Sequence, residues 1–300
     1  MQERFVDDNV FAAEVEERGD PLATLRTLGL LGRVAELEAN GFTIIRPAEF
    51  DGSDLSHRLR EAILATSERV HGRRPDLKMG ATHSNAAMSI GEARFLALLD
   101  DPVFEEALMH PVTQAMADYL LGESAKLSSF STAIRGPGTP ELGLHTDMIL
   151  VPSPFPAFAQ IATIFWILTD VTPEDGSTFF WPGSHKFCRR PTRAECADTS
   201  HRIAVAAPAG SLLVWHGNTW HGAGHKQTDG LRVTMPMHFC RSYFVPQEDY
   251  RSKIGADALA RNGDRFRTLM GVGHPYPFSG QQPDFATLGA MNARSASLFG

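Results

Sequence analysis

The sequence predicts a mostly β fold of the jelly-roll or barrel type, with helices before it and a tail after it. Up to about residue 125 the apolar residues recur mostly at helical spacing. Beyond that point, short runs rich in Val, Ile, Thr, Phe and Trp alternate with Gly and Pro turns, which is typical of closely spaced strands rather than of βαβ units. We therefore expect one domain over residues 1–300. It consists of a helical part (about 1–125), a β core (about 126–245) and a tail (about 246–300) that packs against the core or covers its mouth.

The helical part opens with a predicted helix between two boundary signals. Asp20-Pro21 places a capping residue before a proline, and Asn40-Gly41 provides a C-terminal stop. A short buried strand, Gly41–Ile45, follows. Ser53 is a candidate cap for a second helix, because the apolar residues after it recur at helical spacing. Two or three further helices are expected within residues 91–122.

The β core is predicted from runs of β-branched and aromatic residues, and it also contains all four tryptophans of the chain. This confinement favours an interior lined by aromatic side chains, which suits an apolar ligand, although each tryptophan taken alone is explained by core packing. The predicted strands are Leu127–Ile134, Leu144–Val151, Ala162–Thr169, Ser177–Trp181, Ile203–Ala206, Leu212–Trp215 and Val233–Phe239.

Composition and charge favour a protein that acts on small molecules. The 300-residue chain has a formal net charge of −7 and no basic arm, which argues against nucleic acid or an anionic membrane as its main partner. No run of about 18 apolar residues is present to span a membrane. Three cysteines and an acidic N-terminus without an apolar stretch predict a reducing, cytoplasmic location. The oligomeric state is not predicted.

The strongest local signal for chemistry is the segment Gly143-Leu-His145-Thr-Asp147. Side chains two residues apart on a strand project from the same face, so we expect the imidazole of His145 and the carboxylate of Asp147 to lie close together. A metal site needs a third ligand from a distant strand. The stretch 209–225 offers three candidates, His216, His221 and His225. Two histidines and one carboxylate would form the facial triad of non-haem Fe(II) enzymes, which leaves three coordination positions open.

Arg232 follows this histidine-bearing stretch and directly precedes the predicted strand Val233–Phe239. An arginine that points into an apolar barrel needs an anion, because an unpaired buried charge is very costly. Its planar guanidinium is suited to gripping a carboxylate at two points. Arg232 is therefore a candidate for holding an acidic co-substrate.

Taken together, the motifs resemble those of the phytanoyl-CoA dioxygenase-like family of Fe(II)/2-oxoglutarate oxygenases. The likeness runs from about Asn40 to Arg241. The segment from Trp166 to Lys186 is the most telling, since its Asp-Gly turn is followed by a Pro-Gly-Ser-His turn typical of that family. The motifs are NGFTII, HTD, WILTDVTPEDGSTFFWPGSHK, AGSLLVWHGNTWHGAG and GLRVTM.

The resemblance implies a double-stranded β-helix (a cupin-like jelly roll) with helices packed outside, which uses Fe(II), 2-oxoglutarate and dioxygen. By position it assigns iron ligation to His145, Asp147 and His221, and it makes Arg232 the partner of the distal 2-oxoglutarate carboxylate. Thr178 is expected to assist that carboxylate. Trp166 is expected either to line the co-substrate pocket or to pack in the core.

The resemblance also separates the remaining histidines from the iron ligands. His216 becomes the residue that ends a strand, His225 faces solvent or substrate, and His185 belongs to the turn motif and serves a structural hydrogen bond. The others carry no pattern and are expected to be ordinary surface or hydrogen-bonded histidines: His57, His71, His83, His110, His201, His238 and His274.

Two departures from the family pattern bear on the substrate. The proline-rich segment Pro152–Phe158 is either a plain connection or a wall of the substrate pocket. Ala223 replaces a hydroxyl present there in some relatives, which shifts the binding of the co-substrate onto Arg232. We expect hydroxylation of a medium-sized, partly apolar molecule such as a natural-product scaffold, an acyl derivative or a modified amino acid. Desaturation, epoxidation and ring closure would use the same residues.

Three alternatives remain. A halogenase normally lacks the carboxylate ligand, so Asp147 argues against it. A cupin-like metalloenzyme without 2-oxoglutarate would have no need of Arg232. A non-catalytic ligand-binding protein would not bind Fe(II).

Overall fold

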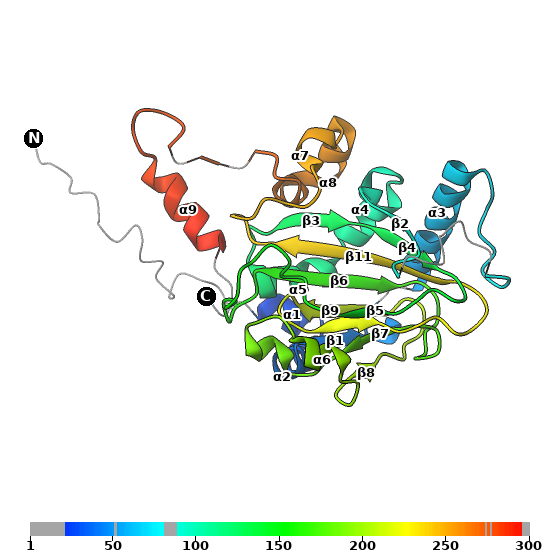
Figure 1. Ribbon diagram of the computed structural model, residues 1–300. Coiled ribbons are helices and arrows are strands. Elements are labelled where there is room, and N and C mark those ends of the chain that lie inside the picture. Colours follow the sequence, from blue (N-terminus) through cyan, green and yellow to red (C-terminus); the bar gives the residue numbers. More distant parts are fainter. Residues whose placement is uncertain (1–21, 51–52, 81–88, 274, 277, 296–300) are drawn as a thin grey trace, which may run out of the picture.

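The computed structural model describes residues 22–50, 53–80, 89–273, 275–276 and 278–295, and its centre is a pair of antiparallel sheets (Figure 1). The strands of the larger sheet pair in the order β1, β9, β6, β11, β4, β2, and β3 pairs with the other half of β11. Their bounds are β1 Phe42–Ile45, β2 Glu92–Arg94, β3 Lys126–Phe130, β4 Thr132–Arg135, β6 Ile161–Ile167, β9 Leu212–His216 and β11 Arg232–Cys240.

The smaller sheet has the order β5, β10, β7, β8. Its strands are β5 Leu142–His145, β7 Thr178–Phe180, β8 Ile203–Ala204 and β10 His221–Ala223. From β4 onward the chain therefore crosses repeatedly between the two sheets, as in a jelly roll. The predicted double-stranded β-helix is confirmed.

The two faces of the larger sheet have different roles. Along β11, Val233, Met235, Met237 and Phe239 belong to the main apolar core, so Arg232, Thr234 and His238 project from the other face. Along β6, Ile164 and Trp166 belong to the same core, whereas Thr163 and Phe165 project toward the smaller sheet. The polar residues thus gather between the sheets.

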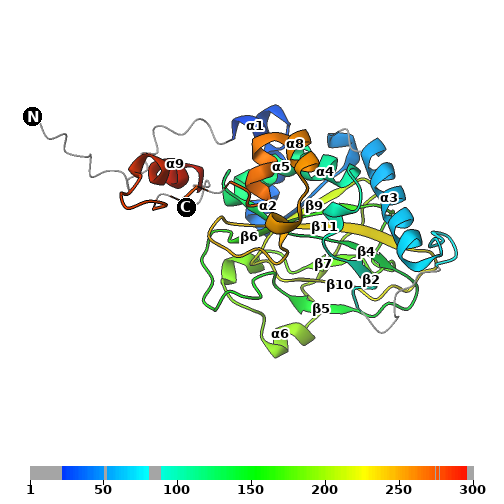
Figure 2. The ribbon, with the colours of Figure 1, turned by 90° about the horizontal axis from the view of Figure 1, so that it is seen from above.

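Helices cover the core-side face of the larger sheet. In Figure 2, α1, α3, α4, α5 and α8 lie along one side of this sheet, and β5, β7 and β10 lie along the other. Their buried apolar side chains form one cluster with those of the sheet. The helices are α1 Ala23–Thr27, α2 Leu31–Asn40, α3 Ser53–His71, α4 Val103–Leu108, α5 Pro111–Leu121, α6 Arg193–Ala197, α7 Tyr250–Lys253, α8 Ala256–Leu269 and α9 Phe285–Ser295; short 3-10 turns occupy Pro47–Glu49, Ala97–Leu99 and Ser184–Phe187. In the described residues, no helix has both the length and the apolar character needed to cross a bilayer.

Several predicted elements need correction. The first predicted helix is two helices, because Gly29 adopts a left-handed conformation (φ 71°) that ends α1 before α2 begins. The predicted strand 144–151 ends at His145, and residues 146–151 form a loop.

Strand β2 lies in a region expected to be helical, and β10 was not predicted because three residues carry too little pattern. The Asp20-Pro21 signal lies outside the described residues, and α3 begins at Ser53.

The tail after β11 is tied to the barrel by the buried carboxylate of Glu248. It accepts hydrogen bonds from the backbone N–H of Leu96 (3.0 Å) and Phe130 (2.9 Å) and from the hydroxyls of Ser129 (3.0 Å) and Tyr250. These donors come from the helical part, from β3 and from α7. One side chain therefore joins three distant segments.

Replacing Glu248 by alanine is expected to lower the free energy of unfolding by about 3 kcal/mol or more, because several buried donors lose their acceptor at roughly 1–3 kcal/mol each. Urea unfolding followed by circular dichroism measures the loss. Glu174→Ala, which removes an exposed carboxylate, is the matched control and should change stability by less than about 0.5 kcal/mol. Equal stability of the two variants would contradict the anchoring role.

Candidate metal centre

The smaller sheet brings two histidines face to face. His145, at the end of β5, is the register partner of His221, at the start of β10, and their ring centroids are 4.3 Å apart. Asp147 follows two residues after His145, and its backbone N–H donates to the carbonyl of Gly217 (3.2 Å). Its Oδ1 lies 3.5 Å from Nε2 of His221. Ligand atoms of the three side chains lie within 4.8 Å of one another, so the group can hold a metal ion.

Backbone carbonyls fix which nitrogen of each imidazole is free. Nδ1 of His145 lies 2.8 Å from the carbonyl of Gly143, and Nδ1 of His221 lies 3.0 Å from the carbonyl of Thr219. A carbonyl only accepts, so each Nδ1 carries a proton, and Nε2 is the nitrogen that can ligate a metal when the ring is neutral. This is how a metal-ligating histidine is usually oriented by its surroundings.

The carboxylate of Asp147 is held by two donors on one oxygen. The hydroxyl of Thr163, on β6, and the indole N–H of Trp215, on β9, each donate to Oδ2 at 2.7 Å. Oδ1 is left for a metal. No sequence motif pointed to Thr163, and core packing alone explained Trp215; only the pairing of β6 with β9 brings the two side chains together.

The charge states also fit metal binding. Burial lowers the pKa of His221 to about 4, so its imidazole is neutral near pH 7. Burial opposes ionisation of Asp147, but the surrounding histidines, His221 foremost, and the Thr163 hydrogen bond outweigh it and hold the pKa at about 2. Metal binding requires a neutral imidazole and an ionised carboxylate, and both are present before any metal arrives.

Replacing Thr163 by valine, which has nearly the same shape, should weaken metal affinity roughly tenfold, because losing a partner of a metal ligand typically costs 10–100-fold. Titration with Co(II) against a competing chelator measures this. Thr163→Ser keeps the hydroxyl and is expected to restore the affinity. Wild-type affinity in the valine variant would show that Trp215 alone orients Asp147.

Two arginines lie side by side in the same space between the sheets. Arg232 on β11 is the register partner of Arg135 on β4, and both donate to the carbonyl of Gly176. Arg232 also donates to the hydroxyl of Thr178 (3.1 Å). Arg135 donates in addition to the carbonyls of Pro140 and Gly224, each at 2.8 Å. Arg135 was missed by the sequence analysis, since it lies outside every motif.

Arg232 forms no ion pair with an acid in the described part of the chain. Its residue is only 4% exposed, and its Nε–H has no acceptor. Asp175 attracts Arg232 from nearby, but its carboxylate forms an ion pair with the buried Lys226 (3.3 Å) instead. Burial, reinforced by the charge of Arg135, lowers the pKa of Arg232 to about 9, which still leaves it protonated at neutral pH. A buried cation with an unpaired Nε–H and no ion pair fits a site for a bound carboxylate.

The arginine site and the histidine site belong to one space. Thr178 is the register partner of Ala223, two residues along β10 from His221. Two residues of a strand span about 7 Å. The residues present thus fit a metal ion and, beside it, a short dicarboxylate.

Other predicted residues lie elsewhere. Trp166 projects from the helix-covered face and packs against Phe50 (5.7 Å) and His110 (6.1 Å), so the structure does not bring it into this space. The reason is strand alternation: Thr163 and Phe165 take the inner face, and Trp166 takes the outer one. Instead, Phe165 lies beneath the guanidinium of Arg232 (5.9 Å).

The other two candidates for the third ligand, His216 and His225, lie away from the metal centre. His216 ends β9, where its Nδ1 accepts from the backbone N–H of Asn218 (3.0 Å) and its ring lies 5.7 Å from that of His185. His225 is exposed.

In the Pro152–Phe158 segment, Phe155 is buried against Met148 in a small apolar cluster.

His238 was expected to be a surface or hydrogen-bonded histidine, and it is hydrogen-bonded, but it also lies beside the metal centre. It projects from the inner face of β11, and its Nδ1 lies 2.8 Å from the hydroxyl of Thr163 and 3.9 Å from Oδ2 of Asp147. Counting by twos from Arg232 along the predicted strand would have placed it on the same face.

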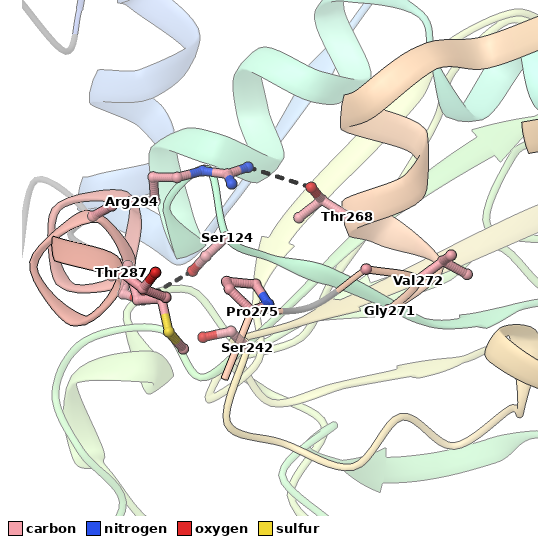
Figure 3. A pocket seen from close by; sticks show the side chains of 12 residues that line it. Ser124, Ser242, Thr268, Gly271, Val272, Pro275, Thr287 and Arg294 are labelled. Carbon is pink, nitrogen blue, oxygen red and sulfur yellow. Dashed lines mark hydrogen bonds between the residues drawn. The ribbon is translucent and has the colours of Figure 1, made fainter. Parts of the chain in front are cut away.

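A cavity of about 180 Å³ lies apart from this centre, between α9, the end of α8 and the turn that follows α5 (Figure 3). Arg294 of α9 donates to the hydroxyl of Thr268 (3.3 Å) there, as Figure 3 shows. None of the residues of the metal centre or the arginine site lines it. It is therefore a separate feature.

The fold and the site together define a class. Two imidazoles and one carboxylate inside a double-stranded β-helix, next to a buried arginine that forms no ion pair in the described residues, are the features of a non-haem iron dioxygenase that uses 2-oxoglutarate.

The sequence itself places the chain within that class. The model of the phytanoyl-CoA dioxygenase (PhyH) family matches residues 37–234, so the chain belongs to this family. Dioxygenase af480 of Aspergillus fumigatus is 26% identical over 207 residues, which span 63% of this chain and 66% of that relative. Dioxygenase hkm4 of Aspergillus hancockii is 31% identical over 165 residues, or 52% of this chain and 51% of that one.

Solved structures share the fold at low sequence identity. HygX from Streptomyces hygroscopicus, solved with nickel and 2-oxoglutarate, has a TM-score of 0.57 at 18% identity and covers 72% of this chain and 88% of its own. SnoN, a non-haem α-ketoglutarate-dependent epimerase from nogalamycin biosynthesis, has a TM-score of 0.54 at 21% identity and covers 88% and 93%.

Proposed function

We propose that this protein hydroxylates a medium-sized, partly apolar small molecule, with Fe(II) held by His145, Asp147 and His221. The observation that carries the proposal is the combination of the ligand triad with Arg232, a buried cation that forms no ion pair in the described residues. A metal alone explains the triad. A dicarboxylate co-substrate is needed to explain the arginine as well.

In this proposal iron and 2-oxoglutarate supply the oxidising chemistry, with release of succinate and carbon dioxide. The protein's own residues bind and orient. Arg232 and Thr178 hold the distal carboxylate of the co-substrate, as the family pattern implies. Phe165 and Trp215, whose rings are 5.8 Å apart, form an apolar wall that excludes water from the space beside Asp147.

The substrate class rests on the walls and on the relatives. Phe180 packs against Trp215 (5.5 Å) on the inner side of the smaller sheet, so the walls near His221 are aromatic. SnoN acts in the biosynthesis of nogalamycin, which supports a natural-product scaffold over an acyl or amino-acid derivative. Desaturation, epoxidation and ring closure use the same residues and are distinguished by the product.

A cupin-like metalloprotein without 2-oxoglutarate, or a non-catalytic binding protein, is the alternative. Arg232 disfavours both, because neither gives a buried cation its anion. A cytoplasmic location is part of the proposal. The three free cysteines, Cys188, Cys196 and Cys240, are compatible with a reducing compartment.

Anaerobic loading with Fe(II) and 2-oxoglutarate tests the function. We expect a metal-to-ligand charge-transfer band in the visible spectrum, followed by succinate formation when dioxygen is admitted. Glutarate, which lacks the 2-oxo group, is the matched control and should give no band. A protein that binds Fe(II) but gives neither band nor succinate would favour the metalloprotein alternative.

A further inference from the structure

His238 lies beside the metal centre but contributes no ligand to it. Its register partner on β6 is Thr163, so both side chains project from the same face of the sheet. Thr163 is fully buried, whereas the side chain of His238 keeps 22% exposure. Since Nδ1 of His238 is directed at Thr163, the exposed part of the ring is the edge that carries Nε2.

Two hydrogen bonds link His238, Thr163 and Asp147, and they determine which group is the donor in each. The ionised carboxylate of Asp147 can only accept, so the hydroxyl of Thr163 gives it its single proton. The oxygen of Thr163 can then only accept from His238, so Nδ1 of His238 carries a proton. Nε2 lies on the other side of the ring, and it has no hydrogen-bond partner in the described part of the chain.

We propose that Nε2 of His238 is a substrate-binding hydrogen-bond acceptor, and that the substrate carries a hydroxyl or N–H group near the position to be oxidised. The inference rests on the proposed function, because Asp147 must be an ionised metal ligand for the hydrogen bonds from His238 and Thr163 to run toward it. It adds a polar requirement to a site whose other walls are aromatic. A purely hydrocarbon substrate would leave a desolvated nitrogen without a partner, at a cost in affinity.

The position of the proton is the first test. Protein labelled with ¹⁵N-histidine is loaded with Zn(II) and 2-oxoglutarate, and the ring nitrogens of His238 are assigned by comparison with His238→Gln. We expect a protonated Nδ1 and an unprotonated Nε2. A ring protonated on Nε2, or on both nitrogens, would overturn the inference. Failure to load Zn(II) and 2-oxoglutarate would instead count against the proposed function, so the two failures are distinguishable.

The acceptor role is the second test, with phenol and anisole as probes of similar shape that differ in the O–H donor. Ligand-observed NMR titration of the loaded protein should give about two- to tenfold tighter binding of phenol, the range expected for one neutral hydrogen bond. His238→Gln places an amide group near Nε2 and should keep this preference. His238→Asn mimics only Nδ1 and should lose it. Equal binding of the two probes by the wild-type protein would overturn the inference.

Discussion

Replacing Asp147 by asparagine is expected to abolish metal binding while leaving the fold intact. Asparagine has the same shape, but its amide oxygen must take the two donors, Thr163 and Trp215, that now share Oδ2. The amide NH₂ group would then face the metal, which it cannot ligate. We expect the affinity for Co(II) to fall by more than about 100-fold, beyond the range typical of losing an outer partner. Succinate formation should disappear with it.

The design separates loss of the ligand from loss of structure. Thermal unfolding of Asp147→Asn should remain cooperative, since volume and hydrogen bonding are preserved. Asp54→Asn, at a position 85% exposed on α3, is the matched control and should bind metal normally. Asp147→Ala removes the ligand too, but it leaves two buried donors unpaired and should also be less stable. Normal turnover by Asp147→Asn would exclude Asp147 as a ligand.

Replacing Arg232 by methionine should raise the KM for 2-oxoglutarate roughly 10–100-fold, the equivalent of about 1.5–3 kcal/mol for hydrogen bonds to a charged group. The ligand-free protein should not become less stable. Arg232 is buried beside Arg135 and forms no ion pair in the described residues, so an apolar replacement removes the cost of desolvating its charge. The carbonyl of Gly176 keeps its hydrogen bond from Arg135 (2.8 Å). Function and stability should therefore change independently.

A second buried arginine provides the comparison. Arg241 donates to the carbonyls of Ala159 (2.6 Å) and Ser295 (3.0 Å), away from the residues of the site. Arg241→Met should lower the melting temperature without changing the KM for 2-oxoglutarate. Steady-state kinetics and calorimetry on both variants measure the contrast. An unchanged KM in Arg232→Met would remove the main argument for a dicarboxylate co-substrate.

The spacing of residues along the chain was sufficient to propose the class of the protein. His145 and Asp147 were placed together by the two-residue period of a strand, and Arg232 was singled out by the cost of burying its charge. The alternation of Gly/Pro turns with short apolar runs predicted the β core. Each of these signals is local, so it can be recognised in the sequence without knowing how the strands pair.

Only the tertiary structure decided what stands opposite those residues. The register of β10 on β5 puts His221, and not His216 or His225, against His145.

The register of β11, β6 and β9 brings His238, Thr163 and Trp215 to Asp147, and it turns Trp166 toward the helices. A shift of one residue in any of these pairings would reverse the faces of a whole strand. Such pairings join segments far apart in the chain, and the packing of both sheets sets them rather than any single motif.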